Sequence, residues 1–356
     1  MFATLGGSLP APTAPTPTVP APASAAPASA ALDDAAQSPN DRLVATALAD
    51  QEAAGLELLT DGGLRHPDPV AAILGGLDGI ELRNGAPPVA RRLPEWRTPI
   101  LVAGWAFAAD RTERPVKQSI VGPYSLGRVV APGRSRRAAV TLAIAEALNA
   151  ELHALVAAGC PVVEIVEDAA VRIGDDPAER RLFVDAQRRL LAGLGEPGTT
   201  DGVHRTLAIR GGNSDTAGAA TILDAPYHSY LFDLCAGPDN WRLVVAVPGD
   251  RGVIVGAADA RDSRPDELEL LAFAIGYAAS TGGRGHARVG LATSGDLAAM
   301  PYEAAISKVR RIGEAAAYYG AEAGTLAQAI DPRAHDIRSA AMGRLAPGKH
   351  QPRGRP

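Results

Sequence analysis

Residues 155–170 read LVAAGCPVVEIVEDAA, and this stretch contains the end of a predicted helix followed by a predicted strand. Its first residues end an Ala- and Leu-rich run over 135–158 that predicts a long helix, and Gly159 is suited to stop that helix. The run Val162–Val166 then predicts a short strand, which the carboxylate of Glu167 follows directly. A helix that leads into such a strand is the pattern of a parallel α/β unit.

The same alternation of strands and helices covers about 300 residues of the chain. The predicted strands are Phe2–Leu5, Leu56–Leu59, Ile100–Ala103, Val116–Val121, Val162–Val166, Thr206–Ile209, Tyr230–Leu234, Val253–Ala257 and Val289–Ala292. The predicted helices are Asp41–Ala54, Ser135–Ala158, Pro177–Leu194, Arg264–Ala279 and Pro301–Tyr319. We therefore predict an α/β fold consisting of a single (β/α)8 TIM barrel.

A (β/α)8 barrel needs eight strands, which is one fewer than the candidates. One of the pair Ile100–Ala103 and Val116–Val121 is therefore assigned to an excursion from the barrel. A doubly wound sheet is the alternative, but it calls for a Gly-rich turn after an early strand. The early segment LGGSLP, residues 5–10, does not have the G-x-G-x-x-G spacing of that turn.

Composition excludes several classes of protein. The net charge of -5 provides no basic field, and the aromatic content of 4% provides no stacking platform, so no nucleic-acid partner is expected. The two cysteines cannot build a disulfide framework, and neither C-x-x-C nor H-E-x-x-H occurs. Without a signal peptide pattern or a run of about 18 apolar residues, we expect a cytoplasmic protein with a small-molecule substrate and no membrane partner.

The chain divides by composition into four segments. Residues 1–9 are expected to form the first strand of the barrel, and residues 10–38 are a nearly pure Ala, Pro, Ser and Thr insertion that predicts disorder. Residues 39–335 supply the remainder of the barrel, and 336–356 read as a disordered basic tail. An insertion directly after the first strand would lie at the rim of the active site, so a lid is one hypothesis for it.

Polar residues recur at the carboxyl ends of the predicted strands, where a barrel places its chemistry. The alternative is that polar residues simply resume where strands end. The residues concerned are Ser8, Asp61, Glu164, Glu167, Arg210, Asn213, Asp233, Asp259, Ser294 and Asp296.

An ordered series of motifs resembles the catalytic domain of the cobalamin-independent methionine synthases, in the superfamily that includes uroporphyrinogen decarboxylase. LGGSLP resembles the first strand of that family, and QEAAGLELLTDGGLRHPD resembles its T-D-G-E-x-R segment at Asp61, Gly62 and Arg65. VKQSIVGPYSL resembles its K…G-P strand, with Lys117 in register. LVAAGCPVVEIVEDAA, IRGGN, GVIVGAADARDSRPDELE and VGLATSGDL resemble later segments in the same order.

The resemblance implies a zinc site whose ligands are a His-x-Cys pair, a glutamate and a late cysteine. These positions fall on Ala208, Arg210, Asp233 and Gly295 in this chain. One acidic ligand cannot hold zinc, which needs four donors, or three and a water. We therefore expect no metal, with Arg210 in the position of the cation and paired with Asp233. The alternative is that this pair is a structural salt bridge only.

The amino-acid pocket that the resemblance implies is also altered. The aspartate that holds the amine of homocysteine in the family falls on Val166, and the preceding glutamine becomes Glu164, on the same face of the strand. Asp61, Arg65 and Lys117 are then the residues left to hold a polyanionic donor of the folate type. For Lys117, a solvated surface position is the alternative.

The resulting functional prediction is a divergent methionine-synthase-like transferase that moves a methyl or related alkyl group to an acceptor other than homocysteine. A metal-free lyase or decarboxylase and a non-catalytic binding barrel are the alternatives. The predicted catalytic residues are Arg210, Asp233 and Glu167. The predicted substrate-binding residues are Ser8, Asp61, Arg65, Lys117, Glu164, Asn213 and Asp296.

Overall fold

The computed structural model describes residues 1–12, 39–131, 133–196, 199 and 201–320. Most of the predicted insertion over 10–38 and all of the predicted tail over 336–356 lie outside the described residues. The segment boundaries placed there, and the lid hypothesis, therefore stay predictions.

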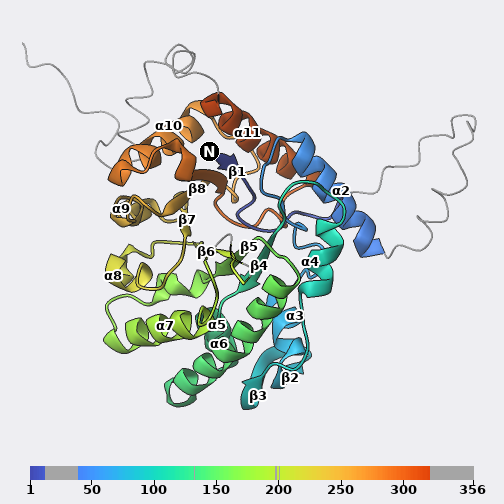
Figure 1. Ribbon diagram of the computed structural model, residues 1–356, viewed down its shortest axis with the longest axis vertical. Helices are drawn as coiled ribbons and strands as arrows, with labels where there is room; N and C mark the ends of the chain where they lie inside the picture. Colours follow the sequence, from blue (N-terminus) through green and yellow to red (C-terminus); the bar gives the residue numbers. More distant parts are fainter. Residues whose placement is uncertain (13–38, 132, 197–198, 200, 321–356) are drawn as a thin grey trace, which may run out of the picture.

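Seven parallel strands form one curled sheet in the order β1-β9-β8-β7-β6-β5-β4, and helices surround it (Figure 1). The strands are β1 (Phe2–Ala3), β4 (Lys117–Val121), β5 (Val162–Val166), β6 (His204–Ile209), β7 (Ser229–Asp233), β8 (Gly252–Ala258) and β9 (Val289–Thr293). The α/β class is confirmed, and β5 has the predicted bounds. Because every pairing is parallel, all carboxyl ends lie at one edge of the sheet.

The predicted strand Leu56–Leu59 appears only as two isolated parallel bridges. Leu58 bridges Thr4, directly after β1, and Leu59 bridges Val116, directly before β4. Hydrogen bonds of 2.9 Å join the Leu59 N–H to the Pro115 carbonyl and the Lys117 N–H to the Leu59 carbonyl. The segment therefore lies between the two edges of the seven-stranded sheet without being a regular strand.

The five predicted helices are all present, with ends shifted by a few residues in most cases. They are α2 (Pro39–Ala53), α6 (Arg134–Ala157), α7 (Pro177–Leu190), α10 (Leu268–Ser280) and α11 (Tyr302–Gly320). At the start of α7 the Asp176 carboxylate accepts the N–H groups of Ala178 and Glu179, and Pro177 occupies the first turn. This is the cap expected for a helix that begins there.

Five further helices were not predicted: α3 (Pro69–Gly76), α4 (Val102–Ala109), α5 (Pro123–Val130), α8 (Ala219–Ile222) and α9 (Trp241–Ala246). Of the pair from which one run was assigned to an excursion, Val116–Val121 supplies β4, whereas Ile100–Ala103 is no strand and leads into α4. The carboxylate of Glu151, on α6, accepts the N–H groups of Ile100 and Leu101. A buried anion from another helix thus satisfies the free N–H groups at this helix start.

An antiparallel hairpin of β2 (Asp78–Arg83) and β3 (Ala86–Glu95) lies outside the curled sheet (Figure 1). Helix α6 packs against β3 and against α5 and α7. By length and composition, Arg136–Ala157 of α6 would be able to cross a membrane, but 56% of its apolar window is buried inside the protein. That burial is the pattern of a core helix.

An apolar layer fills the inside of the curled sheet. It consists of one buried residue from each of five neighbouring strands: Val166, Ala208, Leu231, Ile254 and Ala292. A larger apolar cluster fills the space between the sheet and the helices.

Candidate active site

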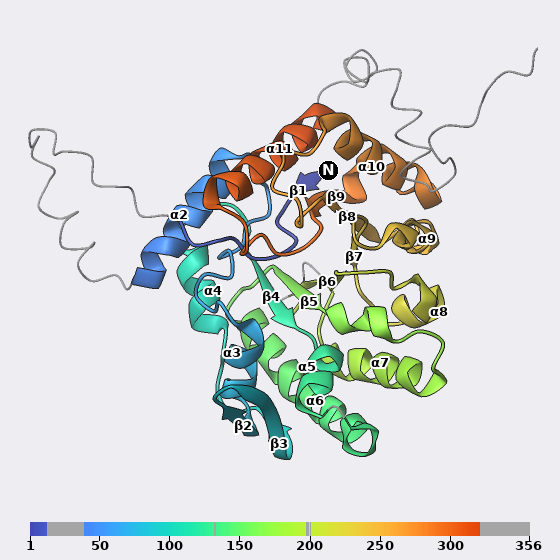
Figure 2. The same cartoon turned by 180° about the vertical axis from the view of Figure 1, so that it is seen from behind.

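A cavity of about 270 Å³ opens at the carboxyl ends of the strands. Figure 2 shows this end of the molecule, where the segments after β1 and β9 cross in front of the strands. One wall comes from His66, Pro67 and α3, and Val166 of the interior layer is part of the lining. The predicted site residues that line the cavity are Ser8, Asp61, Glu164, Arg210 and Asp296.

Glu164 is held in place by a buried ion pair. Its Oε2 lies 2.6 Å from the Lys117 ammonium, which also donates to the Leu5 carbonyl at 2.6 Å. Its Oε1 accepts the hydroxyl of Ser119 at 2.9 Å. Burial lowers the pKa of Lys117, and the attraction of Glu164 opposes this. The alternative of a solvated Lys117 is wrong, because its side chain is buried. Its ammonium pairs with Glu164, so it is not free to bind a polyanionic donor.

The Arg210 side chain extends across the carboxyl end of the curled sheet and binds two carboxylates. Its Nη2 lies 2.8 Å from Asp168 Oδ2, and its Nη1 lies 2.7 Å from the Gly6 carbonyl and 3.1 Å from Asp296 Oδ1. Its Nε donates to Asp168 as well, at 3.1 Å. The guanidinium therefore ties the segments after β1, β5 and β9 together, and each of its nitrogens has a partner.

The predicted pair of Arg210 with Asp233 is wrong. Asp233 Oδ1 accepts the N–H groups of Cys235 and Ala236, at 2.9 and 2.8 Å, and its Oδ2 accepts that of Gly211 at 2.9 Å. Backbone amides thus occupy both oxygens at the turn that ends β7, and Asp233 lies outside the cavity lining. Its role in this geometry is to hold the turn, and the catalytic assignment is not supported.

Asp61 reaches the cavity from a glycine turn. Gly62 and Gly63 have φ angles of +69° and +70°, a conformation that glycine adopts without steric strain and that turns the chain sharply here. A Cβ on Gly63 would lie 2.8 Å from the Cβ of Ser8, so a glutamate has no room in this position. Burial raises the pKa of Asp61, while the Gly63 N–H at 2.8 Å and the charge of His66 oppose the rise.

Glu167 lies outside the cavity lining, so the catalytic assignment is not supported. It is fully buried and accepts four hydrogen bonds, from the N–H groups of Tyr124 and Ser125, the Ser125 hydroxyl and the Gln187 amide. Three of these donors belong to the first turn of α5, so Glu167 anchors the start of that helix. Burial raises its pKa to about 7, against the effect of these hydrogen bonds.

Two predicted binding residues also lie outside the cavity lining. Arg65 forms an ion pair with Asp41 and lies over the Phe107 ring, with its guanidinium carbon 4.5 Å from the ring centroid. Asn213 donates to Asp239 Oδ2 at 3.0 Å and accepts the N–H of Asp239 at 2.9 Å. Substrate-binding roles for Arg65 and Asn213 are therefore not supported.

Sequence reasoning missed several residues at the site, namely His66, Gln118, Ser119 and Asp168. Ser119 was accessible from the sequence, because it lies two residues after Lys117 and side chains alternate along a strand. Asp168 directly follows Glu167, but only the fold reveals which of the two carboxylates turns toward Arg210. His66 carries no local signal, since its position depends on the turn after Asp61.

The residues at the implied metal positions do not fit zinc. Ala208 belongs to the apolar interior layer, Gly295 has no side chain, Arg210 is a cation, and backbone amides occupy Asp233. Burial, followed by the charge of Asp259, raises the pKa of Cys235 to about 12, so its thiol is not a ready ligand. Within the described part of the chain, no group of three or more His, Cys, Asp or Glu residues is placed to hold a metal ion.

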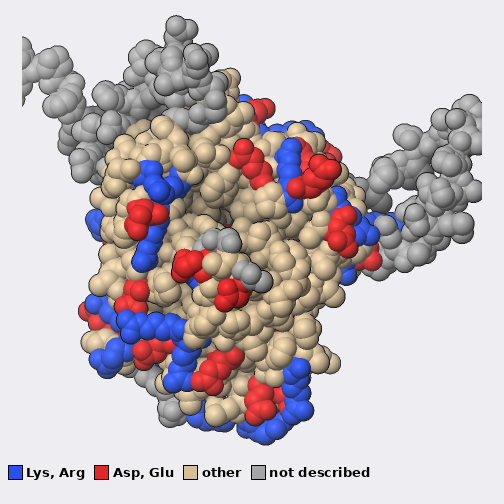
Figure 3. All heavy atoms as spheres, in the orientation of Figure 1, with Lys and Arg blue, Asp and Glu red and all other residues tan. Residues whose placement is uncertain are grey.

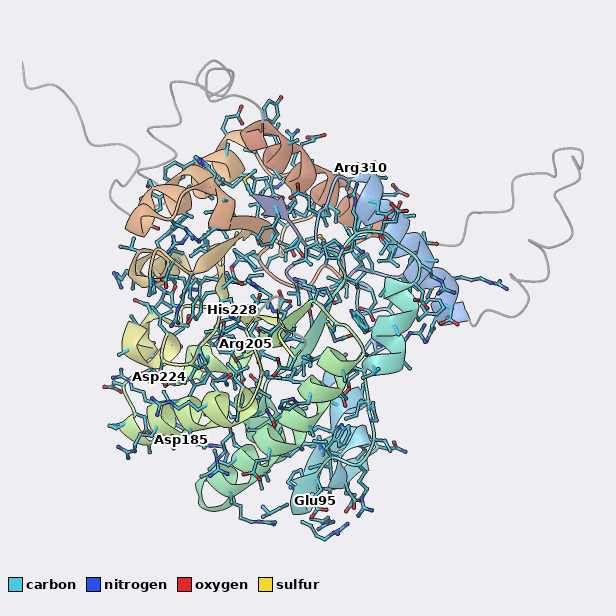
Figure 4. The ribbon with its side chains drawn as sticks, in the orientation of Figure 1. Glu95, Asp185, Arg205, Asp224, His228 and Arg310 are labelled. Atoms are coloured by element: carbon cyan, nitrogen blue, oxygen red, sulfur yellow. The ribbon has the colours of Figure 1, made fainter. Side chains whose placement is uncertain are left out.

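A second cavity, of about 440 Å³, lies at the amino ends of the strands. Figure 4 shows two of its lining residues, Arg205 and His228, close together near the middle of the ring of strands. Arg205 donates to the carbonyls of Leu194 and Gly195, and His228 Nε2 lies 2.9 Å from Glu196. These contacts tie the loop before β6 to the sheet, in keeping with the structural role of this end of such folds.

A curled parallel sheet with a polar cavity at its carboxyl edge defines a barrel-like α/β protein. No family model matches the chain. A B12-independent methionine synthase from Shewanella sp. W3-18-1, in complex with selenomethionine, has 16% identity and a TM-score of 0.71, over 92% of this chain and 98% of that one. The likeness shows that this chain has the fold of that enzyme.

Two other solved structures share the fold. A Listeria monocytogenes protein assigned as a vitamin-B12-independent methionine synthase has 16% identity and a TM-score of 0.63, over 80% of this chain and 87% of that one. A methyltransferase from Methanosarcina mazei has 15% identity and a TM-score of 0.56, over 79% and 86%. The expected resemblance to the methionine synthase family is thus confirmed at the level of the fold.

Proposed function

We propose that this chain is a transferase that moves a methyl or related alkyl group, without zinc, to a small-molecule acceptor other than homocysteine. One observation carries the proposal: Asp61, Glu164 and Asp296 line a cavity at the carboxyl edge of the sheet. Solved proteins with this fold include methionine synthases and a methyltransferase. A decayed site would not be expected to keep three carboxylates around one cavity.

Thiol chemistry is disfavoured by the charges around the cavity. A free thiol has a pKa of about 8.5 and is a poor nucleophile until a cation or a base removes its proton. Among the described residues, Arg210 lines the cavity and Lys117 contacts Glu164, and both cations are already paired with carboxylates. A thiolate would therefore meet an excess of negative charge.

Asp61 is the residue that we assign to proton transfer. Its Oδ1 accepts the Gly63 N–H, while its Oδ2 has no hydrogen bond from the described residues and is left to the cavity. Its raised pKa brings the carboxylate closer to the range in which a general base works. Glu164, fixed by Lys117 and Ser119, orients the acceptor beside it.

A polyglutamylated folate donor fits these residues poorly. Such a donor carries several carboxylates, whereas Arg210 is the single arginine or lysine among the described residues that line the cavity, and its nitrogens are occupied. We further propose that the segment around Leu58 and Leu59 acts as the eighth strand of a closed barrel, supported by its bridges to both edges of the sheet.

Isotope transfer tests the function. The protein is incubated with donors that carry a ¹³C-methyl group on sulfonium, ammonium or reduced-folate centres, together with a mixture of amines, alcohols and thiols. We expect the label to appear in an acceptor by mass spectrometry, and Asp61→Asn to slow transfer by about a hundredfold. Asp262→Asn, which removes the same charge outside the cavity lining, should keep the rate of the unaltered protein.

The outcomes separate the alternatives. Folded protein that transfers no label from any donor contradicts the transferase proposal. Release of CO₂ from carboxylic acids would instead support a metal-free lyase or decarboxylase. Ligand binding without any reaction would support a non-catalytic binding barrel.

A further inference from the structure

The charged groups around the cavity are predominantly acidic. Asp61, Glu164 and Asp296 line it, and Asp168 completes the ion-pair network through Arg210. Against these four carboxylates there are two cations, Lys117 and Arg210. With all of these groups ionised, the cavity and its immediate support carry an excess of two negative charges, which favours a cationic ligand.

The carboxylates around the cavity keep free hydrogen-bond acceptors. The Oδ2 atoms of Asp61 and Asp296 receive no hydrogen bond from the part of the chain that the structure describes. Each carboxylate oxygen of Glu164 accepts a single hydrogen bond, so each has a lone pair left. Arg210, by contrast, uses all three of its nitrogens on Asp168, Asp296 and the Gly6 carbonyl.

The lining also distinguishes between two kinds of cation. A quaternary ammonium or a sulfonium has no N–H to donate and is usually recognised by the faces of aromatic rings. Among the described residues that line this cavity there is no Phe, Tyr or Trp. A protonated amine, with two or three N–H donors, matches the free carboxylate oxygens instead.

From these observations we infer that the cavity binds a small aliphatic amine in its protonated form and rejects the corresponding α-amino acid. A substrate carboxylate would lie among Asp61, Glu164 and Asp296, with Arg210 already paired, so it would be repelled. The inference rests on the proposed function and specifies its acceptor: a primary or secondary amine without a neighbouring carboxylate. An aliphatic amine, with a pKa near that of lysine (about 10.4), arrives protonated at neutral pH.

Calorimetric titration with matched ligands tests this inference. The probes are 3-(methylthio)propylamine, methionine, which adds only a carboxylate, and the N,N,N-trimethyl derivative of the amine. Simple alkylamines and diamines of graded length are included, so that the result does not depend on one side chain. We expect an amine of the series to bind at least about tenfold more tightly than its amino acid and its quaternary derivative.

Variants locate the binding site. Asp61→Asn should weaken the binding of the amine about tenfold or more, and Asp262→Asn, which removes the same charge from an exposed position, should leave it unchanged. Added salt should weaken binding, because the attraction is between charges. Equal or tighter binding of the amino acid, equal binding of the quaternary derivative, or no amine binding at millimolar concentration would each overturn the inference.

Failure here differs from failure of the proposed function. Amine binding without any label transfer would keep the binding inference and remove the transferase. Label transfer to an alcohol or a thiol, with no affinity for amines, would do the reverse.

Discussion

The Lys117 ammonium and the Glu164 carboxylate form an ion pair inside the protein, with Nζ and Oε2 2.6 Å apart and each side chain 1% exposed. The two residues lie on neighbouring strands, β4 and β5, where Ser119 is in register with Glu164. Parallel pairing thus brings a cation, a hydroxyl and a carboxylate together beneath the cavity. Lys117 and Ser119 hold the Glu164 carboxylate in place, and Glu164 is part of the cavity lining.

Removal of one partner of this pair should be costly. Lys117→Met leaves the buried Glu164 uncompensated, so we expect the free energy of unfolding to fall by about 3–5 kcal/mol. The double variant Lys117→Met with Glu164→Leu should recover much of this loss, because it leaves no unpaired buried charge. Urea unfolding at neutral pH measures both, and a stable single variant would show that the pair does not form.

A double-mutant cycle identifies the partner of Arg210. Arg210→Met and Asp168→Asn should show a coupling energy of about 1 kcal/mol, modest because the Asp168 side chain is 44% exposed. Arg210→Met and Asp233→Asn should be additive, since Asp233 is bound by backbone amides. Coupling to Asp233 in place of Asp168 would restore the pairing expected from the sequence.

Zinc should neither copurify with the protein nor stabilise it. The four positions implied by the resemblance provide one carboxylate, already hydrogen-bonded, where zinc needs at least three protein donors. Metal analysis of untagged protein from zinc-supplemented medium should find well below one zinc per chain, and a chelator should not change the Tm. One tightly bound zinc with a raised Tm would show that other residues form a site.

Stability should depend on pH through Glu167. Burial raises its pKa in the folded protein from 4.5 to about 7, so the folded state holds this proton more tightly than the unfolded state does. The resulting stabilisation is present below pH 4.5 and is lost as pH rises toward 7, by up to about 3 kcal/mol. Urea unfolding across this range should show the loss in the unaltered protein and not in Glu167→Gln, and parallel profiles would contradict the assignment.

Replacement of Asp61 should have opposite effects on the stability of the fold and on amine binding. Burial raises its pKa, so the ionised carboxylate costs folding free energy at neutral pH, and this cost disappears as pH falls through the pKa. Asp61→Asn keeps an acceptor for the Gly63 N–H and should raise the free energy of unfolding by roughly 0.5–1 kcal/mol while weakening amine binding. Thermal unfolding at neutral pH with and without amine measures both, and a destabilised variant that still binds would refute this account.

Surface charge adds little to these expectations. On the face shown in Figure 3, acidic and basic side chains lie in small mixed groups, and neither sign covers an extended area.

The sequence predicted those elements whose local signal is strong. Val162–Val166 forms β5 as predicted, because a short apolar run after a glycine-ended helix has few other ways to bury itself. Helix α7 begins at the predicted Pro177, where Asp176 supplies the cap. The sequence did not predict α3, α4 or the hairpin of β2 and β3, and the start of α4 depends on a tertiary contact, that of Glu151 with Ile100.

The candidate site was predicted in part, for a similar reason. Asp61, Glu164 and Arg210 follow from strand ends and alternation, because a parallel sheet places these positions at one edge whatever the loops do. Strand alternation could not show which of Glu167 and Asp168 contacts Arg210, because this depends on the direction in which the chain turns after β5. It also could not place Lys117, whose burial depends on the side chains of neighbouring strands.

The sequence by itself determined the α/β class and most of the strands, because these depend on periodicity and on residue type. Only the tertiary structure decided the partners of each charge: Arg210 with Asp168 and Asp296, Lys117 with Glu164, and Asp233 with backbone amides. The reason is physical. A long charged side chain can reach several candidate partners, and the loops at the carboxyl ends of the strands decide which of them lies close enough to bind. Those loops can come from distant parts of the chain, as the hydrogen bond from Arg210 to the Gly6 carbonyl shows.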